Sequence, residues 1–511
     1  MIWTSQVARD IDQLTTTLYA VPALDLMEEA GLAVARLAME IWKPGLSILV
    51  AAGAGNNGGD ALVAARYLAE AGFAPVVFDV MAEGAQESPD RKTQRLRYEQ
   101  LGQVCRPYRN AQDFSQFSQS TLILDGLLGL GPKQPLRPGL VRQCLEDLAK
   151  LKAEHVLAID LPSGLLADSW QPDEVYLPAT DTITFGAPKL LHILEPSRAS
   201  CGQLRVVPLR FHPEAITKSL QKQDFQLDHD RHVLPESSPW HDLPANAHKF
   251  TRGHILVIGG SAGKLGAPLL AAEAAMRAGA GWVSVALLDD HHRPALPRFL
   301  TYEDFGADPQ RLMPFLHERR VKALVIGPGT MQNPLTPELL RALQDAQKSS
   351  GLFLVFDAGA LKNWSALAQG LIFDPERTLL TPHPGEWRSI AAAHSDLKNL
   401  ETLTSAWNFC ETFGVSVFYK SATPFTVSAH KGRRFLVNSD GSRALGKAGS
   451  GDVLAGVAAA YGCAGHKAGV VGNEAQRAVA KAAQKAVLQW GTDGLGPEDL
   501  IQNLGQDLRS E

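Results

Sequence analysis

Short apolar runs alternate with stretches of helical character along most of the chain. In the first part these runs include residues 47–52 (SILVAA), 121–129 (TLILDGLLG) and 155–164 (HVLAIDLPSG). They have strand length, are rich in Val, Ile and Leu, and show no strict period of two. This pattern is typical of parallel strands that helices bury on both faces. We therefore predict an α/β domain with a parallel sheet for residues 1–214.

The alternation breaks in residues 215–248, which are polar, contain Pro235, Pro239 and Pro244, and have no sustained periodicity. Such composition is typical of a linker. The alternation then resumes with runs such as 254–263 (HILVIGGSAG). We predict a second α/β domain over residues 249–511, and the absence of an obvious repeat argues against a duplication. The expected fold class is α/β, with two three-layer domains.

Composition narrows the class of partner. The 511 residues include 49 Lys and Arg against 54 Asp and Glu, a formal net charge of −5, without a basic block that would bind nucleic acid. The five cysteines are Cys105, Cys144, Cys201, Cys410 and Cys463. Their scatter and odd number favour reduced thiols, and the chain has neither a secretion signal at its start nor an uninterrupted apolar run of about 18 residues. We expect a cytoplasmic homo-oligomer that binds small molecules, with no nucleic acid or membrane as partner.

A glycine-rich turn follows the first apolar run. Residues 53–58 (GAGNNG) match the dinucleotide fingerprint G-x-G-x-x-G, and Asp79 lies about 20 residues further on, as in NAD-using dehydrogenases. However, Asn56, Asn57 and Asp60 make this turn more polar than a pyrophosphate turn requires. The fingerprint therefore indicates a dinucleotide without deciding whether it is a cofactor or a substrate.

Two further strand ends in the first domain carry polar side chains. Asn57, Asp125 and Ser163 offer hard oxygen ligands of the kind that alkali and alkaline-earth cations prefer. Asp160, followed by a proline turn, is a candidate general acid or base at the same rim of the sheet. The structural alternative is that each strand-end aspartate only caps a helix.

The second domain contains a candidate anion-binding helix start. Gly449, Ser450, Gly451 and Asp452 open an apolar helical stretch, so successive N–H groups could hold a phosphate while Asp452 takes a proton from an attacking hydroxyl. This layout is that of ribokinase-like enzymes. The alternative is that Asp452 is merely a charge at a helix terminus. A phosphate-loop interpretation of the preceding Gly-Lys pair fails because Ala448 follows it, where a Ser or Thr is required.

Taken together, the motifs resemble the bifunctional NAD(P)H-hydrate repair enzymes. The stretches GAGNNGGDA, DGLLGLG and DLPSG are similar to the N-terminal epimerase domain of that family. The stretches VIGPGT, FDAGAL, TPHPGEW and KAGSGDVLAG are similar to its C-terminal dehydratase domain. The resemblance implies a Rossmann-like domain that epimerises the R and S forms of hydrated NADH and NADPH. It also implies a ribokinase-like domain that dehydrates the S form with ADP, yielding AMP and phosphate.

The resemblance assigns residues of the epimerase site. Those implied to contact the hydrated dinucleotide are Asn56, Asn57, Gly58, Gly59, Asp60, Gly129, Leu130, Gly131 and Asp160. Asn57, Asp125 and Ser163 are implied ligands of K⁺, and Asp160 is the expected proton shuttle.

The dehydratase site follows in the same way. The residues implied to contact the hydrated nicotinamide nucleotide are Ala267, Gly329, His383 and Asp452. Those implied to line the site of ADP, which would arrive with Mg²⁺, are Lys420, Ser421, Ala422, Thr423, Pro424 and Gly451. Asp452 is the expected base. A lone histidine is usually structural, but the strand-end turn that carries His383 and the adjacent Glu386 favour a functional role here.

Four departures from the family pattern affect the second site. Ser421 and Pro424 stand where the family has a Lys-Gly-x-x-Thr run, Gly359 replaces an aspartate, and Ala448 replaces a glycine. They leave open the choice between ADP and ATP, and the sequence does not decide between the hydrates of NADH and NADPH. The alternative function is a small-molecule kinase of the ribokinase type, fused to a Rossmann-like binding module without activity.

Overall fold

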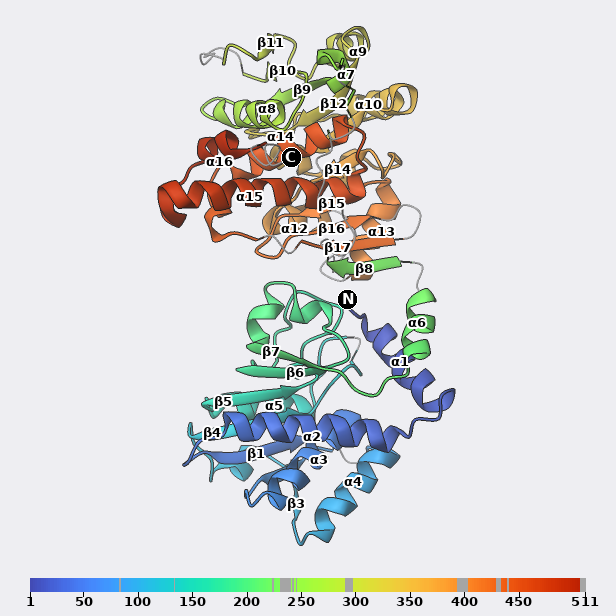
Figure 1. Cartoon of the computed structure of the whole chain (residues 1–511), viewed down its shortest axis with the longest axis vertical. Helices are drawn as coiled ribbons and strands as arrows, with labels where there is room; N and C mark the ends of the chain where they lie inside the picture. The colour runs from blue at the N-terminus through green and yellow to red at the C-terminus, as the bar shows by residue number, and fades with distance from the viewer. Residues whose placement is uncertain are drawn as a thin grey trace. The chain divides into compact units, whose positions relative to one another are not determined.

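The computed structural model describes residues 1–505 except 82–83, 133, 223–224, 230–239, 241–242, 245, 290–296, 393–402, 429–432 and 439–440. It contains two compact units, Met1–Gln223 and Asp224–Glu511 (Figure 1). In each unit, helices cover both faces of a central sheet. The predicted α/β class is therefore confirmed for both halves of the chain.

The described part of the N-terminal unit has a seven-stranded parallel sheet in the order β3-β2-β1-β4-β5-β6-β7. The first six strands have the order of a dinucleotide-binding Rossmann sheet, 3-2-1-4-5-6. The strands are β1 (Ser47–Ala52), β2 (Val76–Asp79), β3 (Cys105–Pro107), β4 (Thr121–Gly126), β5 (His155–Ile159), β6 (Asp181–Phe185) and β7 (Gln203–Val207).

Successive strand residues point to opposite sides of the sheet, and consecutive residues of these strands are apolar. Both faces of the sheet are therefore apolar. In β1, Ile48 and Val50 pack with helices α2 and α3, whereas Leu49 and Ala51 pack with α5. The helices are α1 (Ser5–Thr17), α2 (Ala23–Ile41), α3 (Asn56–Glu70), α4 (Pro89–Gln100), α5 (Leu140–Lys150) and α6 (Pro213–Gln221), with 3₁₀ turns η1 (Ala111–Phe114), η2 (Leu190–His192) and η3 (Ser197–Cys201).

The described part of the C-terminal unit has a ten-stranded sheet in the order β11-β10-β9-β12-β13-β14-β15-β16-β17-β8. The strands from β11 to β15 are parallel, β16 is antiparallel to both neighbours, and β17 is parallel to β8. The strands are β8 (Phe225–His229), β9 (His254–Gly259), β10 (Trp282–Leu287), β11 (Thr301–Glu303), β12 (Val321–Ile326), β13 (Phe353–Phe356), β14 (Thr378–Leu380), β15 (Ser416–Tyr419), β16 (Phe425–Ser428) and β17 (Arg433–Val437).

The alanine-rich helices α8, α14 and α15 pack together with α16 on one face of this sheet. Helices α8 and α14 touch closely, since a Cβ at Gly456 would lie 2.0 Å from the carbonyl oxygen of Ala271. The helices are α7 (Lys249–Arg252), α8 (Gly266–Arg277), α9 (Pro309–Glu318), α10 (Pro337–Ser350), α11 (Trp364–Leu367), α12 (Pro384–Ala392), α13 (Leu403–Phe413), α14 (Ser450–Cys463), α15 (Ala468–Gly494) and α16 (Pro497–Asn503), with η5 (Ala358–Leu361) and η7 (Arg443–Leu445).

The segment expected to be a linker, residues 215–248, contains regular structure at its start. Most of α6 falls within it, and Ile216 and Leu220 of that helix pack against the apolar cluster of Trp3 in the N-terminal unit. Strand β8 pairs with β17 in the C-terminal unit. Both elements gain their stability from partners far away in the sequence, which a local pattern does not reveal. Pro235 and Pro239 lie outside the described residues.

Two of the expected absences concern residues that the structure describes. No helix in the described ranges combines the length and the apolarity needed to cross a bilayer. All five cysteines are described, and all are unbridged thiols.

Candidate active sites

The polar turns of the N-terminal unit lie where the strand order of its sheet reverses (Figure 1). Strand β1 is followed along the chain by β2 on one side and pairs with β4 on the other. Ligands of parallel α/β sheets bind beyond the carboxyl ends of the strands at such a reversal. The asparagine turn (residues 53–60) follows β1 and the glycine loop (residues 127–131) follows β4, so both predicted substrate-binding segments border this position.

Glycine allows the asparagine turn to pack directly on the glycine loop. A Cβ at Gly53 would lie 2.0 Å from the carbonyl oxygen of Leu127, and one at Gly58 would lie 2.0 Å from that of Gly53. A Cβ at Gly59 would lie 2.6 Å from the Sδ of Met27, so this glycine faces helix α2. The turn leads into α3, and the positive end of that helix dipole favours an anion here.

Asp125, Ser163 and Asn57, the predicted cation ligands, are linked by hydrogen bonds around Leu128. Ser163 donates to the buried Asp125 carboxylate from its main-chain nitrogen at 2.8 Å and from Oγ at 2.6 Å. The Leu128 N–H donates to Ser163 Oγ at 2.9 Å, and Asn57 Nδ2 donates to the Leu128 carbonyl at 2.9 Å. Burial raises the pKa of Asp125 to about 6, although the hydrogen bonds from Ser163 oppose the rise.

Asp160 is held as a carboxylate by a buried lysine. It follows β5 with a left-handed backbone (φ 66°). Its Oδ1 accepts hydrogen bonds from Thr184 Oγ1 at 2.9 Å and from Lys189 Nζ at 2.7 Å. Burial alone would raise the pKa of Asp160, but the charge and hydrogen bond of Lys189 outweigh it, so the pKa is lowered. Asp160 can therefore accept a proton at neutral pH.

Lys189 is a residue that the sequence analysis missed. Its side chain is 1% exposed, and Nζ also donates to Thr184 Oγ1 at 2.7 Å. The available signal was a lysine directly after the turn that ends β6 (FGAPK). A buried lysine needs a charged partner, and only the fold brings Asp160 to it.

Asp60, another predicted epimerase residue, lies near Asp160. The pKa of Asp60 is raised well above its ordinary value by burial and by the nearby charges of Asp160 and Asp12. A Cβ at Gly129 would lie 3.3 Å from Cγ of Asn57, so the glycine loop and the asparagine turn are in contact.

The far side of the glycine loop is anchored by the first helix. The carbonyl of Leu130 accepts a hydrogen bond from Arg9 of α1 at 2.7 Å. Gly131 is exposed, and a Cβ there would have no heavy atom within 4 Å. The exposed Asn56 accepts a hydrogen bond from Ser88 Oγ at 2.9 Å.

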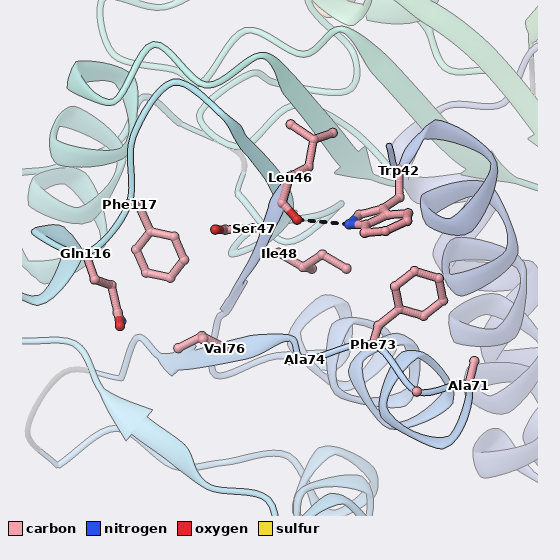
Figure 2. A pocket seen from close by; sticks show the side chains of 11 residues that line it. Trp42, Leu46, Ser47, Ile48, Ala71, Phe73, Ala74, Val76, Gln116 and Phe117 are labelled. Carbon is pink, nitrogen blue, oxygen red and sulfur yellow. Dashed lines mark hydrogen bonds between the residues drawn. The ribbon is translucent and has the colours of Figure 1, made fainter. Parts of the chain in front are cut away.

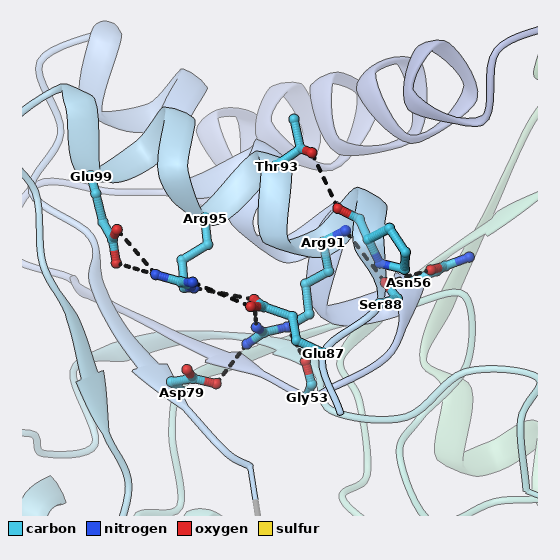
Figure 3. Close-up of polar contacts among 10 residues, drawn as sticks. Gly53, Asn56, Asp79, Glu87, Ser88, Arg91, Thr93, Arg95 and Glu99 are labelled. Carbon is cyan, nitrogen blue, oxygen red and sulfur yellow. Dashed lines mark hydrogen bonds and ion pairs between the residues drawn. The ribbon is translucent and has the colours of Figure 1, made fainter. Parts of the chain in front are cut away.

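Asp79, the acid of the dinucleotide fingerprint, is already paired. Figure 3 shows its carboxylate against the buried Arg91, at 2.6 Å from a guanidinium nitrogen. In NAD-using dehydrogenases the acid at this position binds a ribose hydroxyl. The ion pair with Arg91 argues against that use here.

A pocket of about 460 Å³ lies at the opposite edge of the same sheet (Figure 2). Ser47 and Val76, which line it, begin β1 and β2, whereas the asparagine turn follows the end of β1. The indole N–H of Trp42 in its wall donates to the Leu46 carbonyl at 2.9 Å. None of the predicted site residues lines this pocket, so it is separate from the candidate site.

In the C-terminal unit the strand order reverses between β9 and β12, and glycine loops follow both strands. The Ser261 N–H donates to the carbonyl of Gly329 at 3.0 Å. Gly329 has φ 69°, and a Cβ there would lie 2.3 Å from the Lys264 carbonyl oxygen and 3.0 Å from Cβ of Ala267. The structure thus brings together Ala267 and Gly329, two of the predicted substrate-binding residues.

Lys420 bridges three elements at the rim of this sheet. Its Nζ donates to Asp357 Oδ1 at 2.6 Å, and its main-chain N–H donates to the Pro382 carbonyl at 2.8 Å. Thr381 Oγ1 donates to the same Asp357 oxygen at 2.8 Å. A Cβ at Gly451 would lie 3.4 Å from Lys420 Nζ, so the ammonium lies at the start of α14.

Asp452, in the first turn of α14, has an environment that favours its neutral form. Burial and then the charge of Asp357 raise the pKa of Asp452 to about 7, against the opposing effect of Lys420. Glu386 adds to the rise. A group with a pKa near the working pH is suited to proton transfer in either direction.

Asp357 is the second residue that the sequence analysis missed. Its side chain is 3% exposed, and it directly follows β13 within the stretch FDAGAL. Its importance depends on Lys420, which is 63 residues away in the sequence. Among the described residues, no group of three His, Cys, Asp or Glu side chains could hold a metal ion.

His383 caps the start of α12, and its side chain is also partly open to solvent. Its Nδ1 accepts hydrogen bonds from the N–H groups of Gly385 and Glu386 at 3.0 and 3.3 Å, at the start of α12. Its main-chain N–H donates to Glu386 Oε2 at 2.8 Å. The side chain is 56% exposed, so the ring can contact a ligand while it caps the helix.

The predicted ADP-binding residues 420–424 form the connection between β15 and β16. Ser421 Oγ donates to the carbonyl of Thr423 at 2.7 Å, and the carbonyl of Pro424 accepts from the Asn438 N–H at 2.8 Å. The carbonyl oxygen of Ala422 would lie 3.3 Å from a Cβ at Gly441. This loop joins the start of α14 through Lys420 and Gly451.

Gly359, a departure from the family pattern, has no room for a side chain. A Cβ there would lie 1.9 Å from Oγ1 of Thr330, which is itself bonded to the Gly327 carbonyl at 2.8 Å. The family's aspartate would not fit this position without rearrangement.

Comparison with known proteins matches each unit separately to a family. Residues 23–191 match the model described as YjeF-related protein N-terminus, and residues 255–505 match NAD(P)H-hydrate dehydratase. Both matches agree with the resemblance inferred from the motifs.

Individual relatives match along nearly the whole chain. A bifunctional NAD(P)H-hydrate repair enzyme of Moorella thermoacetica is 30% identical, over 98% of this chain and 95% of that protein. One from Thermofilum pendens is 29% identical over 98% and 94%. A solved ribokinase-like superfamily protein of Enterococcus faecalis V583 is 19% identical, covers 56% of this chain and 96% of its own, and has a TM-score of 0.44.

Proposed function

The chain belongs to the bifunctional NAD(P)H-hydrate repair enzymes, and we propose a distinct activity for each unit. The unit Met1–Gln223 interconverts the R and S forms of hydrated NADH and NADPH. The unit Asp224–Glu511 dehydrates the S form at the expense of ADP. An epimerase beside a stereospecific dehydratase rescues both forms of the damaged nucleotide.

Epimerisation requires only proton transfers. The hydrated ring carries a hydroxyl on a carbon next to nitrogen, so the ring can open to a carbonyl and close again with the other configuration. Asp160 removes the hydroxyl proton and delivers it to the ring nitrogen as the carbon–nitrogen bond breaks, and the same transfers run in reverse when the ring closes. Lys189 at 2.7 Å keeps the carboxylate ionised between turnovers. This carboxylate, at the carboxyl end of β5 and one strand from the reversal point of a Rossmann sheet, is the observation that carries the proposal.

The potassium site of the epimerase is part of the proposal. Asp125, Ser163 and Asn57 present oxygen atoms in one hydrogen-bonded cluster, and none of the ion pairs in the described residues involves Asp125. One carboxylate with neutral oxygens suits a monovalent cation. A bound K⁺ would neutralise the buried carboxylate and hold the asparagine turn against the glycine loop.

Dehydration uses phosphorylation to convert a hydroxyl into a good leaving group. Asp452 takes the proton of the substrate hydroxyl, whose oxygen attacks the β-phosphorus of ADP and releases AMP. The N–H groups at the start of α14 and the ammonium of Lys420 stabilise the transferring phosphoryl group. The ring nitrogen then expels phosphate, and loss of a proton from the adjacent carbon restores the double bond.

The donor set of the second site fits a nucleotide phosphate better than a resident metal ion. Its cation is Lys420, and the described residues offer no three-ligand cluster of His, Cys, Asp or Glu. We therefore propose that Mg²⁺ is bound by the phosphates of ADP when the nucleotide enters, with no dedicated cage of protein ligands.

One assay series tests the proposal. The purified chain is incubated with a mixture of R and S hydrated NADH and with ADP or ATP, with K⁺ or Na⁺, and absorbance near the NADH band is followed. We expect full recovery with ADP and K⁺, because epimerisation feeds the R form to the dehydratase. Turnover of an unrelated alcohol with ATP, without recovery of NADH, would instead establish the small-molecule kinase.

Three expectations stay predictions. Comparing the hydrates of NADH and NADPH in the same assay gives the nucleotide preference. Comparing ADP with ATP gives the phosphate donor. Light scattering after size-exclusion chromatography gives the assembly state, for which we expect a homo-oligomer.

A further inference from the structure

Arg91 in the first turn of α4 is fully buried, which is rare for arginine unless every donor is paired. Figure 3 shows how its guanidinium is placed. It donates to Asp79 at 2.6 Å and forms a second ion pair with Glu87. Its Nε donates to the carbonyl oxygen of Gly53 at 2.5 Å. Two carboxylates thus fix an arginine whose third contact is the asparagine turn.

The Gly53 carbonyl is a sensitive point of that turn. On its other side lies Gly58, where even a Cβ would come within 2.0 Å of the oxygen. Gly58 is the neighbour of Asn57, whose side chain holds the Leu128 carbonyl of the glycine loop at 2.9 Å. A shift of the Gly53 carbonyl would therefore be transmitted to the contact between the two substrate-binding segments.

The segment around Arg91 makes two further contacts with the same turn. The N–H of Ser88 donates to the carbonyl of Ala54 at 3.3 Å, and its Oγ donates to Asn56 Oδ1 at 2.9 Å. Ser88 is also the N-cap of α4, since its Oγ accepts from the Arg91 N–H at 3.3 Å. The start of α4 thus meets Gly53, Ala54 and Asn56 from one side.

We propose that Arg91 is a positioning residue of the epimerase, which holds the asparagine turn in the conformation that binds the hydrated dinucleotide. The inference rests on the proposed epimerase function of this unit. Arg91 is buried beneath the turn and acts through the Gly53 carbonyl, without touching the substrate. Because the proton shuttle Asp160 follows a different strand, Arg91 governs binding more than proton transfer.

A purely structural role makes a different prediction. If Arg91 only stabilised the fold, its loss would reduce the fraction of active enzyme, which lowers the apparent kcat and leaves KM unchanged. A displaced substrate-binding turn instead raises KM and leaves the pH profile of kcat, set by Asp160, where it was. The division between KM and kcat therefore distinguishes the two roles.

The test compares Arg91→Lys with Arg95→Gln in the full-length chain. Arg91→Lys keeps a positive charge for Asp79 and Glu87, which favours folding, but a lysine cannot reproduce the planar fork that also reaches Gly53. Arg95, one turn along α4, forms ion pairs with Glu87 and Glu99 and is the matched control. The dehydratase activity of each variant on the S form reports the integrity of the other unit.

We expect Arg91→Lys to raise the epimerase KM for hydrated NADH by about tenfold, the effect of losing one charge-assisted hydrogen bond. Its kcat should change less than KM, and Arg95→Gln should resemble the parent. Hydrogen exchange of a peptide spanning residues 53–60 should quicken in Arg91→Lys only. If the parent chain is an active epimerase and Arg91→Lys has the same KM as the parent, the assignment is overturned. Unchanged hydrogen exchange of this peptide in Arg91→Lys would overturn it too. A parent chain without epimerase activity would overturn the proposed function and the assignment with it.

Discussion

The two sites each combine a lysine with aspartates, but the lysine contacts a different kind of aspartate in each. In the N-terminal unit Lys189 bonds Asp160 itself at 2.7 Å. In the C-terminal unit Lys420 bonds Asp357 at 2.6 Å. The pKa of Asp452, at the start of α14, is affected mainly by burial and by the charge of Asp357. The pKa is lowered for Asp160 and raised to about 7 for Asp452.

The difference indicates that direct contact with the lysine, and not its mere presence nearby, sets the protonation of the aspartate. Direct contact cancels the cost of burying Asp160 as a carboxylate. Without it, burial and a like charge leave Asp452 near the point of half-protonation. The first arrangement suits reversible removal of a hydroxyl proton, and the second suits a base that works only while a phosphoryl group is transferred.

The strongest test of the comparison removes the second acid. Asp452→Asn should lower the dehydratase rate by about a thousandfold or more, since the base for phosphoryl transfer is lost. Steady-state recovery of NADH from the S form with ADP measures it, and epimerase activity should persist. Asp499→Asn, at the start of the neighbouring helix α16, is the control for a helix-end charge alone. Equal losses in both variants would contradict the catalytic role of Asp452.

Removing the first lysine should have the next largest effect. Lys189→Met leaves the Asp160 carboxylate buried without its cation, so the N-terminal unit should lose about 3–5 kcal/mol of stability. Epimerase activity should fall by about a hundredfold because Asp160 becomes protonated near neutral pH. Denaturant unfolding and epimerase rates are the measurements. Lys150→Met is the control, since the exposed Lys150 forms an ion pair of the same length, 2.7 Å, with the buried Asp147. It should cost less, because Tyr108 still donates a hydrogen bond to that carboxylate.

The pH dependence of the parent chain compares the two sites directly. The dehydratase needs Asp452 deprotonated, so its rate should fall about tenfold per pH unit below the pKa of about 7. The epimerase rate should not fall in this way, because the lowered pKa of Asp160 keeps the carboxylate ionised down to more acidic pH. Both rates are measured on the same preparation between about pH 5 and about pH 8. Parallel profiles would refute the contrast.

The smallest expected effect is a shift in the pH below which the dehydratase rate falls. Asp357→Asn removes the like charge that raises the pKa of Asp452, and it frees Lys420 to interact with Asp452. The pH below which the dehydratase rate falls should therefore decrease by about one unit. The pH profile of the dehydratase is the measurement. Glu386→Gln should shift it in the same direction by less, since Glu386 is a weaker cause of the rise. A shift to higher pH in Asp357→Asn would contradict the assignment of Asp357 as a cause of the raised pKa of Asp452.

Much of the fold and part of each site could be predicted from local pattern. The Val-, Ile- and Leu-rich runs indicated buried parallel strands. A strand-end motif marked the position of Asp160 after β5, and a glycine-rich stretch marked the start of α14, where Asp452 lies. The linker was harder to predict, because α6 and β8 are short elements that depend on distant partners. Lys189, Asp357 and Arg91 were missed since no local pattern marks a buried cation or its counter-charge.

The sequence by itself determined the two α/β units, the glycine-rich turns at strand ends and the family, because strand burial, glycine turns and motif order are properties of short segments. Only the tertiary structure decided which charges meet. Arg91 reaches Gly53 across 38 residues, Lys189 reaches Asp160 across 29 and Lys420 reaches Asp357 across 63. Coulombic and desolvation energies depend on distance and burial in space, so the protonation of Asp160 and Asp452 is set by the fold.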